Sequence, residues 1–434
     1  MFRVWALFLV ACLAFACKAE PPPEPVSDGI IADGVVSHLG IEYAVAERWK
    51  LPELNESWEA AAGFTKFGPA CPQKGQAVMT EDCLFLNVFA PEDAKNAPVL
   101  IWFHGGGFIA GQGGSGPKTF ADDGVVVLTF NYRLGRLGFH DWLGWDENAP
   151  RNFGQADMVA ALEWVQANIE RFGGDPKDVT LMGHSAGGMG VQLILTDPRA
   201  EDKFSRAWAH AGYGAWPFPK ALKIMPEVDA RINYGGPGTD IPAADIVAQT
   251  PFYHLPYTDA PFLREQPAGL WDKGKAVDIP IVTGWNSYDG AGTLGGAGFS
   301  VEGFLKRIDS PEIRAAYADD FAVSDTQAAQ RIFGDMRYGV SSLELAENAK
   351  KGWVFYYDAR QGSAPGAYHG QQYDELFGGV SSDFRTALLS FIKTGNPGWD
   401  ADGVGVFSPD LESEKQGLPG AKRAALTQAL DAMK

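Results

Sequence analysis

Residues 97–103 (APVLIWF) form an uninterrupted apolar run, and residues 125–132 (VVVLTFNY) form a second. A strand with one face in water alternates apolar and polar side chains, so these runs predict strands buried on both faces. Other candidate strands are residues 84–89, 179–182, 204–210, 279–283 and 353–358, and helical spacing extends over 152–172, 189–195 and 382–394. Strands alternating with helices indicate an α/β fold with a mostly parallel central sheet covered on both faces.

Residues 183–187 (GHSAG) lie between a predicted strand and a predicted helix. In that context a G-x-S-x-G pattern is typical of a nucleophile elbow, whose glycines permit a turn tight enough to project the hydroxyl of Ser185 from the sheet. The letters alone are weak, because a chain with 52 Gly contains this pattern by chance about 0.4 times. A glycine-rich turn without chemistry is the alternative.

A glycine run at residues 105–107 follows directly on the apolar strand at 97–103. Ester hydrolysis passes through a tetrahedral intermediate with an oxyanion, which needs closely spaced backbone N–H donors, and glycines allow such crowding. Ala186, next to the candidate nucleophile, would supply a further N–H. A phosphate-binding loop is the alternative, but no G-x-x-x-x-G-K-[ST] pattern is present.

A Ser nucleophile requires a base and an orienting acid, which in this kind of fold follow the Ser in the order acid, then His. His369 lies in a glycine-flanked loop after the predicted strand at 353–358. His210 follows the predicted elbow helix too closely to leave room for the acid before it, and no predicted strand precedes His254. Asp289 is the only carboxylate in the loop 284–290, which follows the strand at 279–283. Asp278 lies before that strand, at the wrong end.

These motifs resemble the type-B carboxylesterases, a family that includes cholinesterases and bacterial para-nitrobenzyl esterases; the chain looks like a short bacterial-type member. The resemblance is carried also by residues 39–44 (LGIEYA), 81–88 (EDCLFLNV), 131–139 (NYRLGRLGF) and 172–176 (FGGDP). It implies an α/β-hydrolase fold and cleavage of small-molecule carboxylic esters without a metal or cofactor. Carried over residue by residue, it implies a triad of Ser185, Asp289 and His369, oxyanion donors at Gly106, Gly107 and Ala186, and a disulfide between Cys71 and Cys83.

The sequence departs from that family in three ways. The family usually has Glu before the nucleophile, where this chain has His184, and its acid is more often Glu than Asp. The segment at about 213–278, which shapes the substrate pocket in relatives as a helical cap, is shorter. The aromatic residues Tyr213, Trp216 and Phe218 are candidates to line that pocket together with His184, and ordinary core packing is their alternative role.

The N-terminus predicts export. Residues 1–17 have a basic start and an apolar run at 4–16 that is short for a spanning helix, which is typical of a signal peptide. Either Cys12 or Cys17 could be the lipidated residue of a lipoprotein, and cleavage after Ala16 is the alternative. Residues 18–27 are then a Pro-rich tether, and residues 28–434 form a single catalytic domain. The protein is expected to be periplasmic, secreted or lipid-anchored to a bacterial membrane, with membrane attachment only through that lipid.

Cysteine count and charge complete the sequence-based picture. Two of the four Cys lie in the signal region, which leaves Cys71 and Cys83 as a disulfide in an exported protein, or as two buried thiols. A net charge of −18 repels phosphate backbones and argues against nucleic-acid binding. The chain is expected to be a monomer or dimer. Amide or lactone hydrolysis by the same triad remains an alternative, as does a non-catalytic binding or adhesion protein on the esterase scaffold.

Overall fold

The fold is that of a computed structural model. The structure describes residues 24–26, 29–60, 63–76, 79–140, 150–217, 241–250, 255–258, 263–276, 278–360, 362, 364–401, 404–407 and 420–433. The predicted signal, most of the tether and much of the predicted cap, including Phe218 and His254, lie outside these residues.

A ten-stranded sheet forms the centre, with the order β1-β2-β5-β7-β6-β8-β9-β10-β11-β12. Neighbouring strands are parallel from β7 to β12 and antiparallel from β1 to β7. The strands are β1 Ile30–Ala32, β2 Val35–Glu42, β5 Phe85–Pro91, β6 Ala97–Phe103, β7 Val126–Phe130, β8 Gly174–His184, β9 Arg206–His210, β10 Pro280–Asn286, β11 Lys351–Tyr357 and β12 Val404–Phe407, beside a small pair β3 Ala44–Val45 and β4 Glu53–Leu54.

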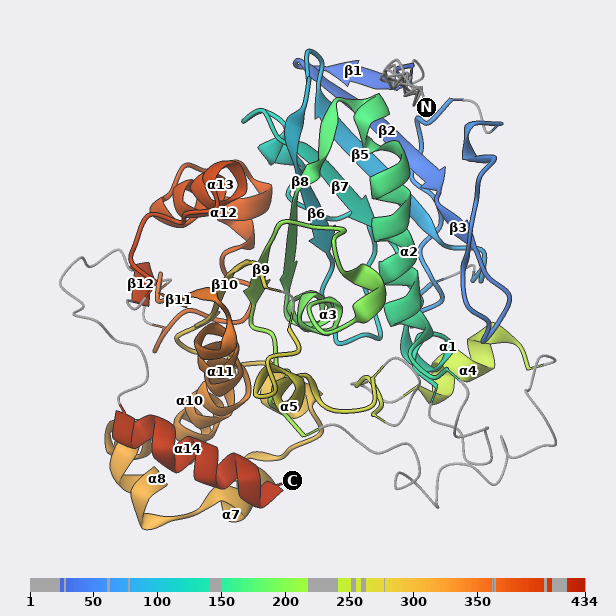
Figure 1. The fold of residues 1–434 in the computed structure, drawn as a ribbon. Coiled ribbons are helices and arrows are strands. Elements are labelled where there is room, and N and C mark those ends of the chain that lie inside the picture. The colour runs from blue at the N-terminus through green and yellow to red at the C-terminus, as the bar shows by residue number, and fades with distance from the viewer. Residues whose placement is uncertain are drawn as a thin grey trace, which may run out of the picture.

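Helices lie on both sides of this sheet (Figure 1). The main ones are α1 Gly135–Gly138, α2 Phe153–Asn168, α3 Ala186–Ile194, α4 Ala243–Gln249, α5 Pro267–Trp271, α6 Thr293–Gly296, α7 Val301–Ile308, α8 Pro311–Ala316, α9 Ala318–Val323, α10 Asp325–Gly334, α11 Val340–Asn348, α12 Tyr373–Phe377, α13 Asp383–Thr394 and α14 Gly420–Met433. A π-helical turn, Asp335–Gly339, joins α10 to α11, and short 3₁₀ turns occur at Trp58–Ala60, Lys118–Phe120, Ile169–Phe172 and Pro198–Ala200. None of the described helices has both the length and the apolar character that crossing a membrane requires.

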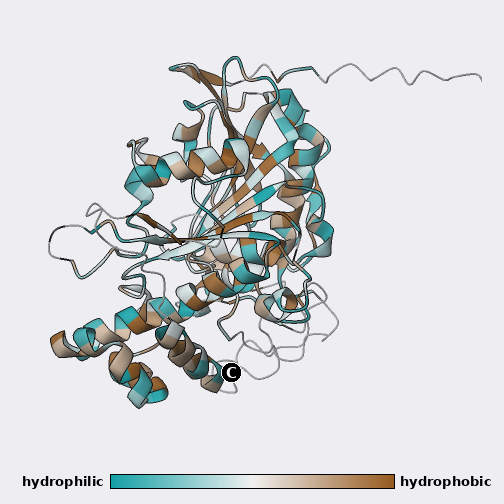
Figure 2. Ribbon diagram, turned by 60° about the vertical axis from the view of Figure 1, so that its left-hand side comes forward, coloured by the Kyte–Doolittle hydropathy of each residue, from teal (hydrophilic) through white to brown (hydrophobic). Residues whose placement is uncertain are grey.

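The strand β6 shows why its sequence is apolar throughout. Its residues Val99, Ile101 and Phe103 pack into the core that α2 and α3 cover, while Leu100 and Trp102 pack into the core that α13 covers. Because both faces are buried, no position on the strand can be polar without a partner. The ribbon coloured by hydropathy shows apolar residues concentrated along the sheet and on the inward faces of the helices (Figure 2).

The elements that the sequence predicted differ from the structure mainly in their ends, whereas the helices α7 to α11 and α14 were not predicted. The strand predicted at 179–182 extends over Gly174–His184, and the helix predicted to start at 189 begins at Ala186, immediately after the nucleophile candidate. The acid-bearing loop predicted at 284–290 is shorter, because β10 continues to Asn286 and pairs with β11 along its length. The order of strands and helices that carries the candidate site is otherwise as predicted.

Candidate active site

Ser185 stands between β8 and α3 in a backbone conformation that side-chain-bearing residues rarely adopt, with φ 59° and ψ −123°. The turn is possible because the residues that flank it closely, Gly183 and Gly187, have no side chain. A Cβ on Gly187 would lie 1.9 Å from the carbonyl oxygen of Phe103, and one on Gly183 would lie 2.3 Å from the backbone of Gly187. Both positions therefore require glycine, and the strained Ser is held by the backbone N–H that it donates to the carbonyl of His210 at 2.9 Å.

The glycine loop after β6 approaches the elbow from the neighbouring strand. Gly106 and Gly107 have positive φ values of 112° and 62°, and a Cβ on Gly105 would lie 3.5 Å from Cβ of Ser185. Within the described part of the chain, the backbone N–H groups of Gly106, Gly107 and Ala186 donate to no acceptor. The loop thus provides the kind of closely spaced, unengaged donors that an oxyanion requires.

Two side chains that the sequence did not single out fix this loop. The His104 ring stacks on Tyr132 with centroids 4.2 Å apart, and its Nδ1 lies 2.9 Å from the Gly105 carbonyl. The Tyr132 hydroxyl donates to the His104 carbonyl at 2.7 Å. Burial lowers the pKa of His104 to about 4, so the ring is neutral at neutral pH and acts as a fixed hydrogen-bond donor.

Asp289 and His369 meet as predicted, although 80 residues separate them. The Nδ1 atom of His369 lies 2.5 Å from Oδ1 of Asp289, while Oδ2 of Asp289 accepts the backbone N–H of Asn286 at 2.9 Å. Asp289 is buried and the His369 side chain is 16% exposed. No hydrogen bond joins Ser185 to His369 among the described residues; such bonds are often long in unliganded enzymes and tighten with substrate.

The loops that carry the acid and the base are tied together. The Ser287 hydroxyl donates to Asp358 and accepts the backbone N–H of Ala367 at 2.8 Å. The backbone N–H of Tyr288 donates to the Ala367 carbonyl at 2.9 Å, and Arg331 donates to backbone carbonyls of both loops. These bonds fix the position of the His369 loop relative to Asp289, which a long, glycine-rich loop alone could not do.

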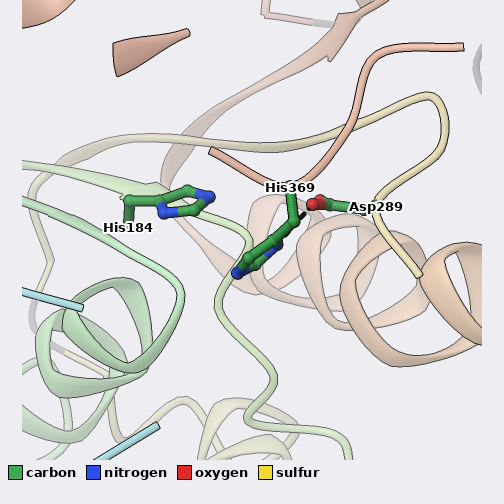
Figure 3. Close-up of side chains that lie close together, drawn as sticks. All are labelled: His184, Asp289 and His369. Atoms are coloured by element: carbon green, nitrogen blue, oxygen red, sulfur yellow. Dashed lines mark hydrogen bonds and ion pairs between the residues drawn. The ribbon is translucent and has the colours of Figure 1, made fainter. Parts of the chain in front are cut away.

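His184, the residue before Ser185, is buried beside His369. Its ring centroid lies 4.4 Å from that of His369, and its Nδ1 atom lies 2.7 Å from the Tyr373 hydroxyl. Figure 3 shows His369 lying between His184 and Asp289. Burial, with smaller contributions from the neighbouring His369 and His210, holds the pKa of His184 well below its usual range.

The two rejected candidates for base and acid have other positions. His210 is buried at the end of β9, where its Nε2 atom donates to Oδ1 of Asn286 at 2.8 Å. Burial lowers the pKa of His210 to about 4, partly offset by Asp289 and by the bond to Asn286. Asp278 forms a surface ion pair with Lys350, with 2.8 Å between Oδ2 and Nζ.

The predicted pocket residues are only partly described. Tyr213 and Trp216 are buried and pack against the guanidinium of Arg337, which lies 4.2 Å and 5.0 Å from their ring centroids. Tyr213 also contacts Tyr338 of the π-helical turn, which in turn stacks on His369 at 5.3 Å. The aromatic cluster thus reaches His369 through Tyr338, a residue that no local sequence signal indicated.

A cavity of about 520 Å³ lies beside the glycine loop. It is bordered by Gly105 and Gly106 on one side and by Tyr373 and Phe377 of α12 on another. The loop that the disulfide between Cys71 and Cys83 closes supplies a third wall, with Gln73, Lys74 and Gln76.

Among the described residues, one group of side chains is close enough together to hold a metal ion: His184, Asp289 and His369. Their potential ligand atoms all lie within 4.8 Å of one another. The hydrogen bond between His369 and Asp289 accounts for that grouping, because an acid must touch the imidazole it orients.

A buried Ser in a strained strand-to-helix turn, with an imidazole bound to a carboxylate on loops that follow neighbouring parallel strands, is the arrangement of the α/β-hydrolase serine hydrolases, and this chain has their architecture. Comparison with known proteins agrees. The model of the carboxylesterase family matches residues 27–230. The para-nitrobenzyl esterase of Bacillus subtilis is 29% identical over 86% of this chain and 89% of its own length.

Two further comparisons extend the likeness. The fumonisin B1 esterase of Sphingopyxis macrogoltabida is 31% identical over 75% of this chain and 67% of its own length. A solved PNB esterase superposes with a TM-score of 0.75 and 27% identity, covering 92% of this chain and 97% of that one. The chain belongs to the carboxylesterase family, and it is a serine hydrolase of carboxylic esters.

Proposed function

We propose that Ser185 is the nucleophile of this esterase, His369 its general base and acid, and Asp289 the residue that orients His369. The observation that carries the proposal is the 2.5 Å contact between His369 Nδ1 and Asp289 Oδ1. It lies at the carboxyl ends of the parallel strands, where Ser185 forms the elbow after β8. That contact places the Nδ1 proton toward the carboxylate and leaves Nε2 as the basic nitrogen.

Two acyl transfers then follow. His369 Nε2 takes the hydroxyl proton as Ser185 attacks the ester carbonyl, and the N–H groups of Gly106, Gly107 and Ala186 stabilise the oxyanion. The tetrahedral intermediate collapses to an acyl-enzyme while His369 protonates the leaving alcohol. Water, deprotonated by His369, attacks the acyl-enzyme and releases the acid and the free Ser185.

The cavity beside Gly105 and Gly106 is proposed to receive part of the ester, because it borders the loop that would hold the oxyanion. Its lining combines the aromatic rings of Tyr373 and Phe377 with the amide side chains of Gln73 and Gln76. A wall of this mixed character suits an ester with both an apolar and a polar part.

A panel of p-nitrophenyl esters from acetate to laurate tests the assignment. Ser185→Ala is expected to lower kcat by about 10⁴-fold or more, because the nucleophile is lost. Ser390→Ala, on the exposed side of α13, serves as the matched control and should retain full activity. Equal turnover by wild type and Ser185→Ala would refute the nucleophile. Parallel assays with p-nitroanilides and lactones test the amidase and lactonase alternatives, and no turnover of any substrate would favour a binding protein.

We also propose that the protein is exported, as a lipoprotein or a released enzyme, and works as a monomer or dimer. Support comes from the signal-like sequence at residues 1–17 and from the disulfide between Cys71 and Cys83, a bond that persists in oxidising compartments. The mass of the mature N-terminus tests export, and sedimentation of the purified enzyme tests the oligomeric state.

A further inference from the structure

His184 raises a question that the catalytic triad leaves open, because a fourth side chain is buried against the base. Its ring is tilted by 43° to the His369 ring at a centroid distance of 4.4 Å. The Tyr373 hydroxyl, 189 residues away in sequence, holds its Nδ1 atom at 2.7 Å, and the two rings meet edge to face at 5.0 Å. Position 184 is thus fixed from α12 as well as from its own strand.

Both members of this pair are neutral at working pH. Burial, and to a lesser degree the charge of Asp289, raises the pKa of Tyr373 above its usual range, so the phenol keeps its proton. The Tyr373 hydroxyl is therefore available to donate to Nδ1 of His184, which leaves the His184 proton on Nε2. That Nε2 atom is buried and has no hydrogen-bond partner in the described part of the chain.

The surroundings of His369 explain why neutrality matters. Among the described residues, several titratable or charged side chains surround His369. Three follow strands: Asp289 after β10, His184 at the end of β8 and His210 at the end of β9. The others are Tyr338 and its neighbour Arg337 on the π-helical turn, and Tyr373 on α12. Asp289 is the one carboxylate among them. A second carboxylate in place of His184 would stabilise the imidazolium and delay its loss of a proton to higher pH.

We propose that His184 is a positioning residue that, held by Tyr373, packs against the His369 ring and fixes it together with Asp289 and, as a neutral group, lets the esterase work at lower pH than a carboxylate at position 184 would allow. The inference rests on the proposed role of His369 as base. It adds a second structural support to the ring, since Asp289 holds one nitrogen while the His184 ring packs against the His369 ring (Figure 3).

The decisive measurement is the pH profile of kcat/KM for p-nitrophenyl acetate. His184→Glu is expected to move the acid limb upward by about one pH unit or more, because a charge within about 5 Å acts directly on the imidazolium. His184→Gln, which is neutral, should leave the acid limb in place and lower kcat by about 3- to 10-fold through a less well-held base. An acid limb of His184→Glu that coincides with wild type would overturn the proposal.

Tyr373→Phe tests the holding bond without altering position 184. It should lower kcat more than it changes KM while the acid limb stays in place; full activity in both Tyr373→Phe and His184→Gln would show that the pair positions nothing. His184→Asp repeats the charge test if His184→Glu does not fold.

The rate at which a fluorophosphonate labels Ser185, measured over the same pH range, provides a readout that does not depend on the ester chosen. A wild type that neither turns over esters nor is labelled would refute the proposed function itself. Normal wild-type activity with profiles insensitive to residue 184 would refute only the role of His184.

Discussion

Asp289 is buried, yet both of its carboxylate oxygens accept hydrogen bonds, one from His369 and one from the backbone N–H of Asn286. A buried carboxylate is costly unless it is paired in this way. The side chain is one methylene shorter than Glu, and it still reaches His369 Nδ1 at 2.5 Å. The pairing therefore fixes both the tautomer and the orientation of His369.

Replacing the acid by an amide isolates that effect. Asp289→Asn keeps the shape of the side chain but removes the charge and presents an N–H₂ or a weaker acceptor to His369, so the wrong tautomer becomes accessible. We expect kcat for p-nitrophenyl acetate to fall by about 10³- to 10⁴-fold. Asp278→Asn, on the surface, is the matched control and should be as active as wild type. A loss of less than tenfold in Asp289→Asn would contradict the assignment.

At this scale the sequence predicts residues whose place follows from strand order and misses those whose place follows from packing. Asp289 and His369 could be found because reactive residues gather where parallel strands end. The contacts of Tyr373 with His184 and of Tyr132 with His104 could not, because each joins segments that only the finished sheet brings together. No periodicity marks a tyrosine for such a role.

At the scale of elements, the carboxyl ends of β6, β8 and β9 each bury a histidine: His104, His184 and His210. The strands themselves were recognisable as apolar runs, but their ends were not, since β8 and β10 continue through polar residues that pair along the sheet. Each histidine is neutral in the folded protein, and burial is the largest cause of its lowered pKa.

These buried histidines predict acid sensitivity. In the unfolded chain a histidine has a pKa near 6.5, so below that value the unfolded state binds more protons than the folded state. The stability that His104 and His210 contribute is complete above about pH 6.5 and is lost as the pH falls toward their folded pKa values of about 4. Each loss is on the order of 3 kcal/mol, so the free energy of unfolding should fall clearly between pH 7 and pH 5.

Urea unfolding followed by tryptophan fluorescence at several pH values measures this dependence. His210→Gln can still donate to Asn286 but cannot titrate, so its free energy of unfolding should fall less steeply than that of wild type below pH 6.5. Because other groups titrate equally in both proteins, the difference between the two slopes isolates His210. Parallel slopes would show that the buried histidine does not contribute to acid unfolding.

At the scale of the whole molecule, a strongly acidic catalytic domain with one disulfide follows a signal-like segment and a Pro-rich tether. The disulfide between Cys71 and Cys83 closes a short loop beside the candidate substrate cavity, and constraining that loop is expected to stabilise the fold by about 3 kcal/mol. Such a bond is useful only where it stays oxidised, so the site and the proposed export depend on the same compartment.

Export predicts a shortened mature chain. When the full sequence is expressed with its own N-terminus in a Gram-negative host, we expect intact mass spectrometry to find the signal-like segment removed, either up to Ala16 or up to Ala11. A lipoprotein would carry a lipid mass on Cys17 or Cys12 and fractionate with membranes, whereas a released enzyme would be unmodified and soluble in the periplasm. Cys17→Ser and Cys12→Ser, each expressed separately, identify the lipidated residue, because only the substitution at that residue should abolish the lipid mass. Recovery of an unprocessed chain that retains Met1 in the cytoplasm would contradict export.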